Sequence, residues 1–278
     1  MAQWREAPEL VLKSTRVLIA AAAVACAGPN SGEGAAHAPT RAFPAAPLFA
    51  AAIVPTGGAS DVVPPTPERP RSLSMGRPNR GALVNGVSMT DGPNWVVVNP
   101  QRAWGTDETI RSLVAAISAV NDAFPGSPKL YVGDISAERG GYIRPHHSHQ
   151  SGRDVDLGLY YLQGSAWFVR ASAKNLDCAR TWELVTALIR DPNVEIIFLD
   201  RSIQRLLKDY AVKAGESRER LDSLFDERSA FSDRLIRHQW GHLTHMHVRF
   251  KSQIAQDAGE RAYRELALLH RVPPAKYY

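Results

Sequence analysis

Two short segments of the chain concentrate side chains that could bind a metal ion. Residues 146–156 read HHSHQSGRDVD and residues 240–250 read WGHLTHMHVRF, and together they hold six of the nine histidines. Imidazole and carboxylate groups are preferred ligands of first-row divalent metals, and two histidines with one acidic residue form a common catalytic zinc site. A metal centre built from both segments is therefore the first hypothesis, ahead of a generic secreted domain.

The spacing within each segment suggests which side chains would act as ligands. Asp154 and Asp156 would share one face of a strand, and so would His245 and His247, which would lie roughly 6–7 Å apart along it. Together with His149, this favours His149, Asp156 and His247 as the three protein ligands. A catalytic zinc site keeps its fourth position open, and His245 would lie beside it.

His245 is the candidate catalytic residue. Zinc lowers the pKa of bound water. A neutral imidazole could then accept the proton of that water, or stabilise developing negative charge, and pass a proton to a leaving amine. Each segment alone is a weak signal, because strands often carry two histidines by chance. The alternative interpretation is a set of structural histidines.

For the other side chains of the two segments, the sequence predicts less specific roles. His146 is expected to hydrogen-bond a ligand, with a second, weaker metal site as the alternative. Asp154 either orients a ligand or stabilises the turn. Arg249 could hold a substrate carboxylate through bidentate hydrogen bonds or form an ion pair. Trp240 fits the core better than a substrate platform.

The composition of the chain is that of an ordinary globular protein. Of 278 residues, 44% are hydrophobic and 22% are charged, and the formal net charge is +5. Basic residues are mixed with acidic ones and form no stripe interleaved with aromatic residues, which argues against a nucleic-acid partner. The two cysteines, Cys26 and Cys178, permit at most one disulfide and no CxxC zinc site.

The beginning of the chain has the pattern of an export signal. Lys13 and Arg16 precede an apolar run over residues 17–25, which is too short for a permanent membrane span. Residues 25–27 resemble a cleavage site, whereas residues 23–26 resemble a lipoprotein motif. We therefore expect an exported, periplasmic protein, with membrane attachment through a lipidated Cys26 left open.

The composition divides the chain into three regions. Residues 1–27 form the expected signal, and residues 28–80 are rich in Ala, Pro, Gly, Ser and Thr without periodicity. Such a stretch buries too little apolar surface to offset the entropy of ordering it, so we predict a disordered tether. The folded domain is expected over residues 81–278.

Strand and helix patterns alternate within that domain. Strands are predicted over residues 94–98, 129–135, 155–161, 194–199 and 245–250, and helices over 106–124, 181–190, 202–210, 216–237 and 254–269. The connections do not follow regular βαβ units. We therefore predict an α+β domain whose small sheet is mainly antiparallel and flanked by helices.

Both histidine segments resemble those of the penicillin-insensitive murein endopeptidases, a branch of the LAS zinc metallopeptidases. That family carries a His-x-x-His-Gln-x-Gly-x-Asp-x-Asp segment and a Trp-Gly-His-x-x-His-x-His-Val-Arg segment, and both occur here in the same order. The resemblance covers about residues 81–250. It implies a LAS- or Hedgehog-like domain and a zinc ion held by His149, Asp156 and His247. It also implies that His245 is catalytic and that His146 and His242 line the site.

The resemblance further implies the substrate class. Family members hydrolyse peptide cross-links of peptidoglycan, so cell-wall peptides are the expected partners. Two alternatives stay open: a D-amino-acid carboxypeptidase of the same group that acts on stem peptides, and a non-catalytic, zinc-containing cell-wall-binding module. The presence of His245 favours an enzyme over the module. The sequence does not set the oligomeric state.

Overall fold

The computed structural model describes residues 70–269. The expected signal over residues 1–27, Cys26 and most of the expected tether lie outside the described residues. None of the helices within 70–269 has the length and apolar character needed to cross a membrane.

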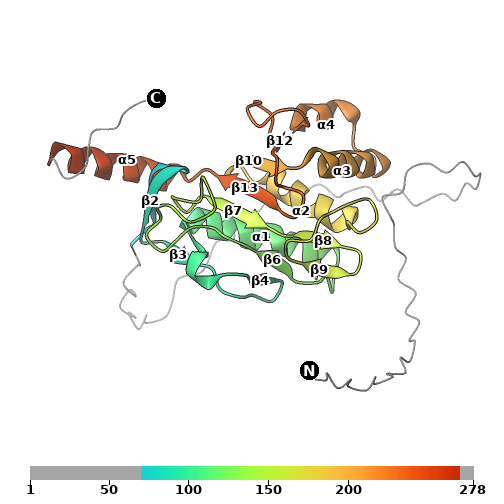
Figure 1. Cartoon of the computed structure of the whole chain (residues 1–278), viewed down its shortest axis with the longest axis horizontal. Helices are drawn as coiled ribbons and strands as arrows, with labels where there is room; N and C mark the ends of the chain where they lie inside the picture. Colours follow the sequence, from blue (N-terminus) through green and yellow to red (C-terminus); the bar gives the residue numbers. More distant parts are fainter. Residues whose placement is uncertain (1–69, 270–278) are drawn as a thin grey trace, which may run out of the picture.

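A seven-stranded sheet forms the centre of the domain, in the order β11-β12-β10-β13-β7-β6-β4 (Figure 1). Its strands are β4 (Trp95–Val97), β6 (Leu130–Val132), β7 (Asp154–Leu157), β10 (Val194–Leu199), β11 (Phe225–Asp226), β12 (Ile236–His238) and β13 (Met246–Phe250). The strands β10, β13, β7 and β6 pair antiparallel in that order, whereas the outer pairs β11-β12, β12-β10 and β6-β4 are parallel.

The sheet is therefore larger than expected and mixed, so the prediction of a small, mainly antiparallel sheet is wrong. The α+β class fits the structure in its coarser sense, as helices and strands in one domain. For the parallel pairs β4-β6 and β10-β12, the physical reason lies in the connections. A helix, α1 (Asp107–Ala123), lies between β4 and β6, and two helices lie between β10 and the β11–β12 pair. Such crossovers return the chain in the same direction and make neighbouring strands parallel.

The folded part begins before the expected boundary at residue 81. A hairpin pairs β1 (Leu73–Arg77) with β2 (Arg80–Val84), and it buries Ser74 and Leu83. Its tight turn falls on Pro78 and Asn79, which are residues that the composition assigned to the tether. Two further small sheets pair β3 (Val87–Ser88) with β5 (Trp104–Gly105), and β8 (Leu159–Tyr161) with β9 (Gly164–Ala166).

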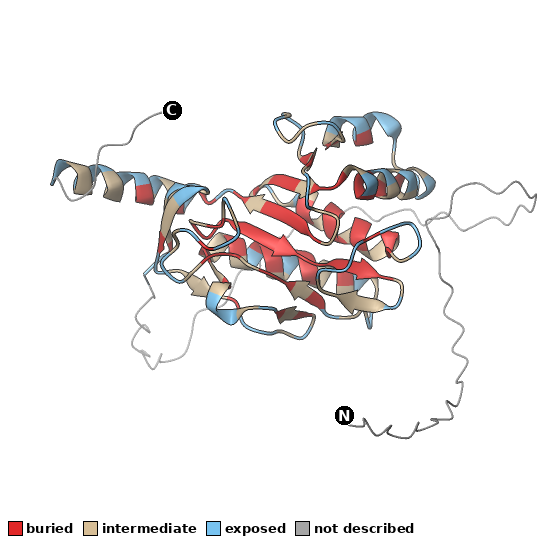
Figure 2. Cartoon of the chain, viewed as in Figure 1, coloured by how far each residue is buried: buried red, intermediate tan, exposed pale blue. Residues whose placement is uncertain are grey.

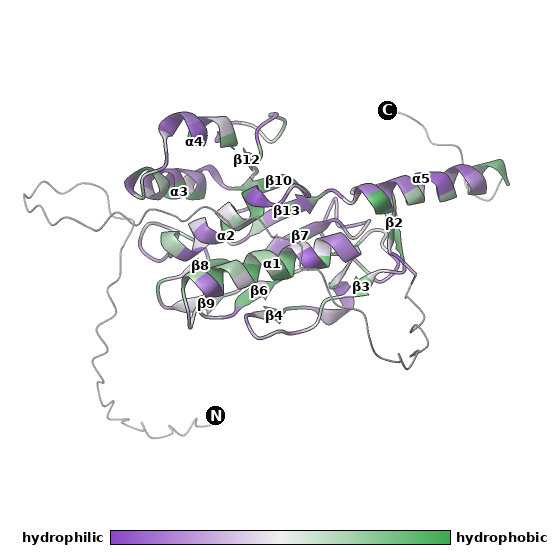
Figure 3. Cartoon of the chain, turned by 180° about the vertical axis from the view of Figure 1, so that it is seen from behind, coloured by the Kyte–Doolittle hydropathy of each residue, from purple (hydrophilic) through white to green (hydrophobic). Residues whose placement is uncertain are grey.

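Helices cover one face of the main sheet and extend beyond one of its edges. The helix α1 and its neighbour α2 (Cys178–Arg190) lie in front of the sheet in the rear view of Figure 3, and α2 contacts α3 (Arg201–Lys213). The side chains of Thr106, Asp177 and Asp200 accept backbone hydrogen bonds at the starts of these helices. The helix α4 (Arg218–Leu224) is much shorter than the helix expected over 216–237. Phe225 instead enters the edge strand β11, Ile236 enters the neighbouring strand β12, and both side chains become buried.

Hydrophobic and polar residues alternate along the two central strands, β7 and β13, and so lie on opposite faces of the sheet. Val155 of β7 and Val248 of β13 are fully buried in the hydrophobic core, which also contains Leu113 and Ile117 of α1 (Figure 2). Neighbouring residues in a strand point to opposite faces. The acidic and histidine side chains of β7 and β13 therefore point away from the helix layer, and the sheet presents them together on its other face.

The last described helix, α5 (Gln253–Leu268), packs on the hairpin strand β1 and extends away from the domain (Figure 1). The contact is close at Gly259, where an added Cβ would lie 2.3 Å from the carbonyl oxygen of Ser74. A glycine inside a helix normally lowers stability, so this residue reflects the need for backbone to approach backbone.

The first prediction concerns Gly259→Ala. In most helices this change would raise stability by about 0.5–1 kcal/mol. Here the methyl group meets a backbone atom, so we expect urea denaturation to show a loss of about 1–3 kcal/mol in the free energy of unfolding. Glu260→Ala, at an exposed position of the same helix, is the control and should change that free energy by less than about 0.5 kcal/mol. A stabilised Gly259→Ala protein would contradict the packing.

Candidate metal centre

The register between β7 and β13 brings the two histidine segments together. In this antiparallel pair Asp156 lies opposite His247, and Asp154 lies opposite Arg249. Side chains directly opposite each other in such a pair have Cβ atoms about 4.5–5.5 Å apart, so both can reach the same metal ion. The loop between β6 and β7 supplies His149, which has a left-handed backbone φ of 63°.

Three predicted ligand atoms converge with almost equal spacing. The Nε2 atom of His149 lies 3.2 Å from Nδ1 of His247 and 3.3 Å from Oδ1 of Asp156, and Nδ1 of His247 lies 3.2 Å from the same oxygen. Ligands that surround zinc tetrahedrally at 2.0–2.1 Å are separated from each other by about 3.3 Å. The three atoms therefore have the spacing of one face of such a site.

The polar environment of these atoms also fits a cation. The Oδ1 atom of Asp156 is buried and has no hydrogen-bond partner among the described residues. The Nδ1 atom of His149 lies 3.1 Å from the carbonyl oxygen of Ile135, an acceptor that requires a proton on Nδ1 and so leaves a lone pair on Nε2. A bound divalent ion would satisfy both atoms, so the residues present fit a metal.

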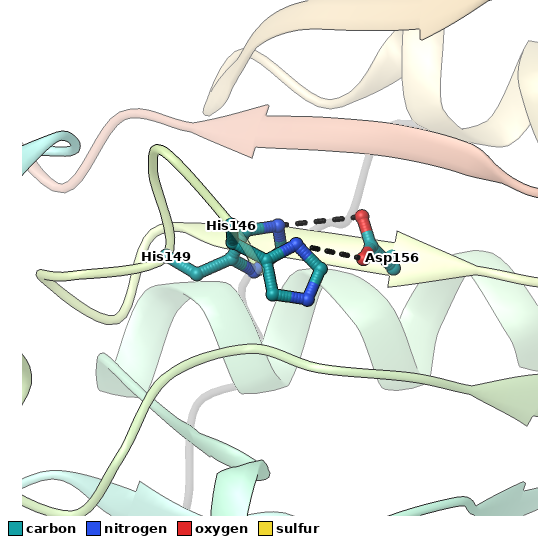
Figure 4. A group of neighbouring side chains, drawn as sticks. All are labelled: His146, His149 and Asp156. Atoms are coloured by element: carbon teal, nitrogen blue, oxygen red, sulfur yellow. Dashed lines mark ion pairs between the residues drawn. The ribbon is translucent and has the colours of Figure 1, made fainter. Parts of the chain in front are cut away.

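A second group overlaps the first. His146, His149 and Asp156 offer ligand atoms that all lie within 4.8 Å of one another, and these residues could hold a metal ion (Figure 4). Within this group the Nδ1 atom of His146 lies 3.7 Å from Oδ2 of Asp156. The other ring nitrogen, Nε2, lies 2.9 Å from Oδ2 of Asp134. In the group that contains His247, the ligand atoms lie closer together, 3.2–3.3 Å apart. Both groups include His149 and Asp156.

The carboxylate of Asp154 contacts three residues around the site, namely Arg249, His149 and His247. It accepts two hydrogen bonds from the guanidinium of Arg249, at 2.7 and 3.2 Å, and one from the backbone N–H of His149. Its Oδ1 also lies 3.3 Å from Nε2 of His247. Burial alone would raise the pKa of Asp154, but His247 and Arg249 hold it well below its usual range. Arg249 is thus engaged by Asp154 rather than presented to a substrate.

The pKa of His247 is shifted in the opposite direction, upward. Burial disfavours its charged form, but the carboxylates of Asp154 and Asp156 raise its pKa to about 9. The ring of His247 therefore holds a proton at neutral pH when no cation is bound. A metal must displace that proton, because only the neutral imidazole coordinates.

Two further histidines stand beside the group. The Nε2 atom of His245 lies 3.8 Å from Oδ1 of Asp156, and its Nδ1 lies 3.0 Å from Oγ1 of Thr244. The ring of His242 lies 4.9 Å from that of His245, and its Nδ1 lies 3.1 Å from the carbonyl oxygen of Trp240. Burial lowers the pKa of His245 and lowers the pKa of His242 to about 4, so both rings are neutral at pH 7.

The sequence did not reveal several neighbours of these histidines. Asp134 binds His146 and also accepts a hydrogen bond of 3.0 Å from Arg102. Asp134 fell within the predicted strand over residues 129–135, ahead of the first histidine segment, and this placement was the only available signal. Phe168, which stacks on His245, lies outside both segments and gave no signal. The core interpretation of Trp240 is wrong, because 72% of its surface is exposed.

A comparison with protein families identifies the class. The model of the penicillin-insensitive murein endopeptidase family matches residues 74–263, which is more than half of the chain. The chain belongs to this family. No curated protein matches the chain at a significant level. The match begins in β1 and ends in α5, so it agrees with the boundaries of the structure better than with the expected domain over 81–278.

Family membership confirms the predicted resemblance and the broad class of activity. Penicillin-insensitive murein endopeptidases are hydrolases that act on murein, the peptidoglycan of the cell wall. Because murein lies outside the cytoplasmic membrane, the family also implies an extracytoplasmic place of action.

The second prediction concerns the murein endopeptidase with Arg249→Met. This change leaves the buried carboxylate of Asp154 without its bidentate partner, so we expect a loss of about 3 kcal/mol in the free energy of unfolding. Arg249→Lys keeps the charge and should lose less. Arg190→Met, at an exposed position 4.0 Å from Glu183, is the control and should change that free energy by less than about 0.5 kcal/mol. Urea denaturation of metal-free protein is the measurement. Equal effects at Arg249 and Arg190 would contradict a structural role for the Asp154 pair.

Proposed function

We propose that this murein endopeptidase depends on zinc and hydrolyses the peptide cross-links of peptidoglycan. The observation that carries the proposal is the convergence of three ligand atoms, 3.2–3.3 Å apart. One of them is the buried Oδ1 of Asp156, which has no hydrogen-bond partner among the described residues. Two imidazoles and one carboxylate are a recurrent ligand set of catalytic zinc. Zinc in such a site supplies a Lewis acid that polarises a carbonyl group and makes water more acidic.

His149, Asp156 and His247 are the proposed ligands. Their mutual distances match a tetrahedral site, whereas the nearest nitrogen of His146 lies 3.7 Å from the carboxylate of Asp156. Each imidazole ligand also has a group that orients it: the carbonyl oxygen of Ile135 lies beside His149, and Asp154 lies beside His247. Partners of this kind set the tautomer and the direction of a ligand ring.

His245 is the proposed proton carrier. Its ring is neutral at pH 7, and a proton on Nδ1 can be donated to Oγ1 of Thr244, which leaves Nε2 as a base. This Nε2 atom lies 3.8 Å from a ligand oxygen, close enough to reach water at the same site. In the proposed reaction Nε2 takes a proton from the attacking water and delivers it to the leaving amine. The cross-link amide is thereby replaced by a carboxylate and an amine.

His146 and His242 are proposed to line the site. Asp134 holds the Nε2 edge of His146, so the Nδ1 edge faces Asp156. The backbone carbonyl of Trp240 holds His242 next to His245. Both rings could bind polar groups of the substrate peptide. An export signal over residues 1–27 and a periplasmic location complete the proposal, with lipidation of Cys26 and plain cleavage of the signal as the two routes of processing. The signal and both routes rest on the sequence pattern alone.

The third prediction separates the two overlapping ligand groups. His247→Ala removes a proposed ligand, so purified protein should contain almost no zinc. His146→Ala removes a neighbour and should weaken zinc binding by no more than about 10–100-fold. His147→Ala, at an exposed position of the same loop, is the matched control. Metal content by mass spectrometry and titration with zinc provide the measurement. Full zinc content in His247→Ala, together with its loss in His146→Ala, would replace His247 by His146 in the ligand set.

The fourth prediction tests the reaction. Wild-type enzyme with zinc should convert cross-linked muropeptide dimers to monomers, and a chelator should stop this conversion until zinc is restored. His245→Ala should keep its zinc and lose at least about 100-fold in rate, because its proton transfer is gone. His147→Ala should match the wild type.

Chromatography and mass spectrometry of the products distinguish the alternatives. Release of a terminal D-amino acid with intact dimers would indicate a carboxypeptidase. Bound zinc without any turnover would indicate a cell-wall-binding module.

A further inference from the structure

Phe168 covers the face of the proposed proton carrier. It follows β9, outside both histidine segments, and its ring stacks on that of His245 with centroids 5.2 Å apart and planes inclined by 20°. Trp167 adds an edge contact to Phe168, with centroids 5.2 Å apart, and lies 6.3 Å from His245. The three aromatic side chains therefore form one group that ends at the proposed active site.

The backbone of Phe168 is strained. Among residues 70–269, three residues other than glycine have a positive φ, namely Asn85, His149 and Phe168, whose φ is 61°. Asparagine tolerates this left-handed region, and His149 is a proposed ligand, whereas a bulky aromatic residue is disfavoured there. Burial does not explain the position, because 59% of Phe168 is exposed. Strained residues of this kind concentrate at functional sites.

The surrounding chain is anchored well enough to hold this strain. The ring of Trp167 packs on the backbone of Gly133, where an added Cβ would lie 2.2 Å from the ring. The phenolic O–H of Tyr161 donates to the carbonyl oxygen of Val169. The backbone N–H of Ala171 donates to the carbonyl oxygen of Leu243, in the loop that leads to His245. Residues 167–171 are thus attached both to the sheet and to the histidine loop.

The contacts of His245 show what Phe168 adds. Thr244 contacts one edge of the ring at Nδ1, and Asp156 lies beyond the other edge at Nε2. The contact at Nδ1 and the ring of His242, 4.9 Å away, already restrain the ring of His245, but neither stacks on its face. The phenyl group of Phe168, stacked on that face, adds resistance to rotation about the bond to Cβ and so helps to keep Nε2 directed toward the reacting groups.

We propose that Phe168 is a positioning residue that fixes the ring orientation of His245, and that its strained backbone is retained for this purpose. The inference rests on the proposed function, because it assigns a task to the same proton carrier. Phe168 acts through His245 and needs no contact with the scissile bond. Its removal should therefore reduce turnover more than substrate binding.

The test compares Phe168→Gly, Phe168→Ala and Phe168→Tyr in the full-length, zinc-loaded enzyme. Cleavage of muropeptide dimers should show a kcat lower by about 10–100-fold in the Gly and Ala variants, with KM and zinc content unchanged. Phe168→Tyr keeps a ring on His245 and should restore most of the activity. Thermal unfolding supplies a second readout: Phe168→Gly should melt above Phe168→Ala. At ordinary positions alanine is the more stable of the two, but at positive φ it is strained.

Two control variants match the two changes made at Phe168. Phe231→Leu removes an exposed phenyl group elsewhere, and Asn85→Gly relaxes an exposed left-handed residue elsewhere. Both should keep the wild-type kcat. A wild-type kcat in Phe168→Gly, a rise in KM alone, or a higher melting temperature for Phe168→Ala than for Phe168→Gly would overturn the inference while the proposed function stands. An inactive wild-type enzyme would instead defeat the proposed function.

Discussion

The pairing of β7 with β13 is the constraint on which the proposed site depends. Its register sets Asp156 opposite His247 and Asp154 opposite Arg249, although the two strands are far apart in sequence. Both strands lie inside the seven-stranded sheet and have neighbours on each side. A slip by one residue would move these polar side chains into the core and Val155 out of it, so burial itself protects the register. The sheet, rather than a flexible loop, sets the distance between Asp156 and His247, the two proposed ligands that it carries.

Charge balance explains why this arrangement calls for a cation. Two carboxylates, Asp154 and Asp156, point to the same buried face, and buried charges are costly unless they are paired. Arg249 compensates Asp154, whereas Oδ1 of Asp156 has only imidazole nitrogens around it. Without a metal, the raised pKa of His247 places a proton there as a partial substitute. A divalent ion bound at the proposed site would replace that proton and supply the charge that the protein groups lack.

The sequence predicted the strands and the histidine segments that carry the site, because alternation and residue type are local signals. The strand over 194–199 and the helix after Thr106 were predicted nearly at their observed limits. The parallel edges of the sheet, the β1–β2 hairpin and the strands at Phe225 and Ile236 were not predicted. In each case the deciding factor is burial against residues far away in the chain. The roles of Asp134 and Phe168 were not predicted for the same reason. Asp134 comes into contact with His146, and Phe168 with His245, only in the folded protein.

The loops around the site are less regular than the strands, yet their own hydrogen bonds attach them to the sheet. His149 has a left-handed backbone, and it is held by Asp154 through its backbone N–H and by Ile135 through its ring. The histidine loop is attached through the backbone of Asp200, whose N–H donates to the carbonyl oxygen of His242. Strain of this kind persists only where the surroundings over-determine the conformation. The rigid sheet thus stabilises the site twice, once by carrying ligands and once by supplying the anchors that hold the strained loops in place.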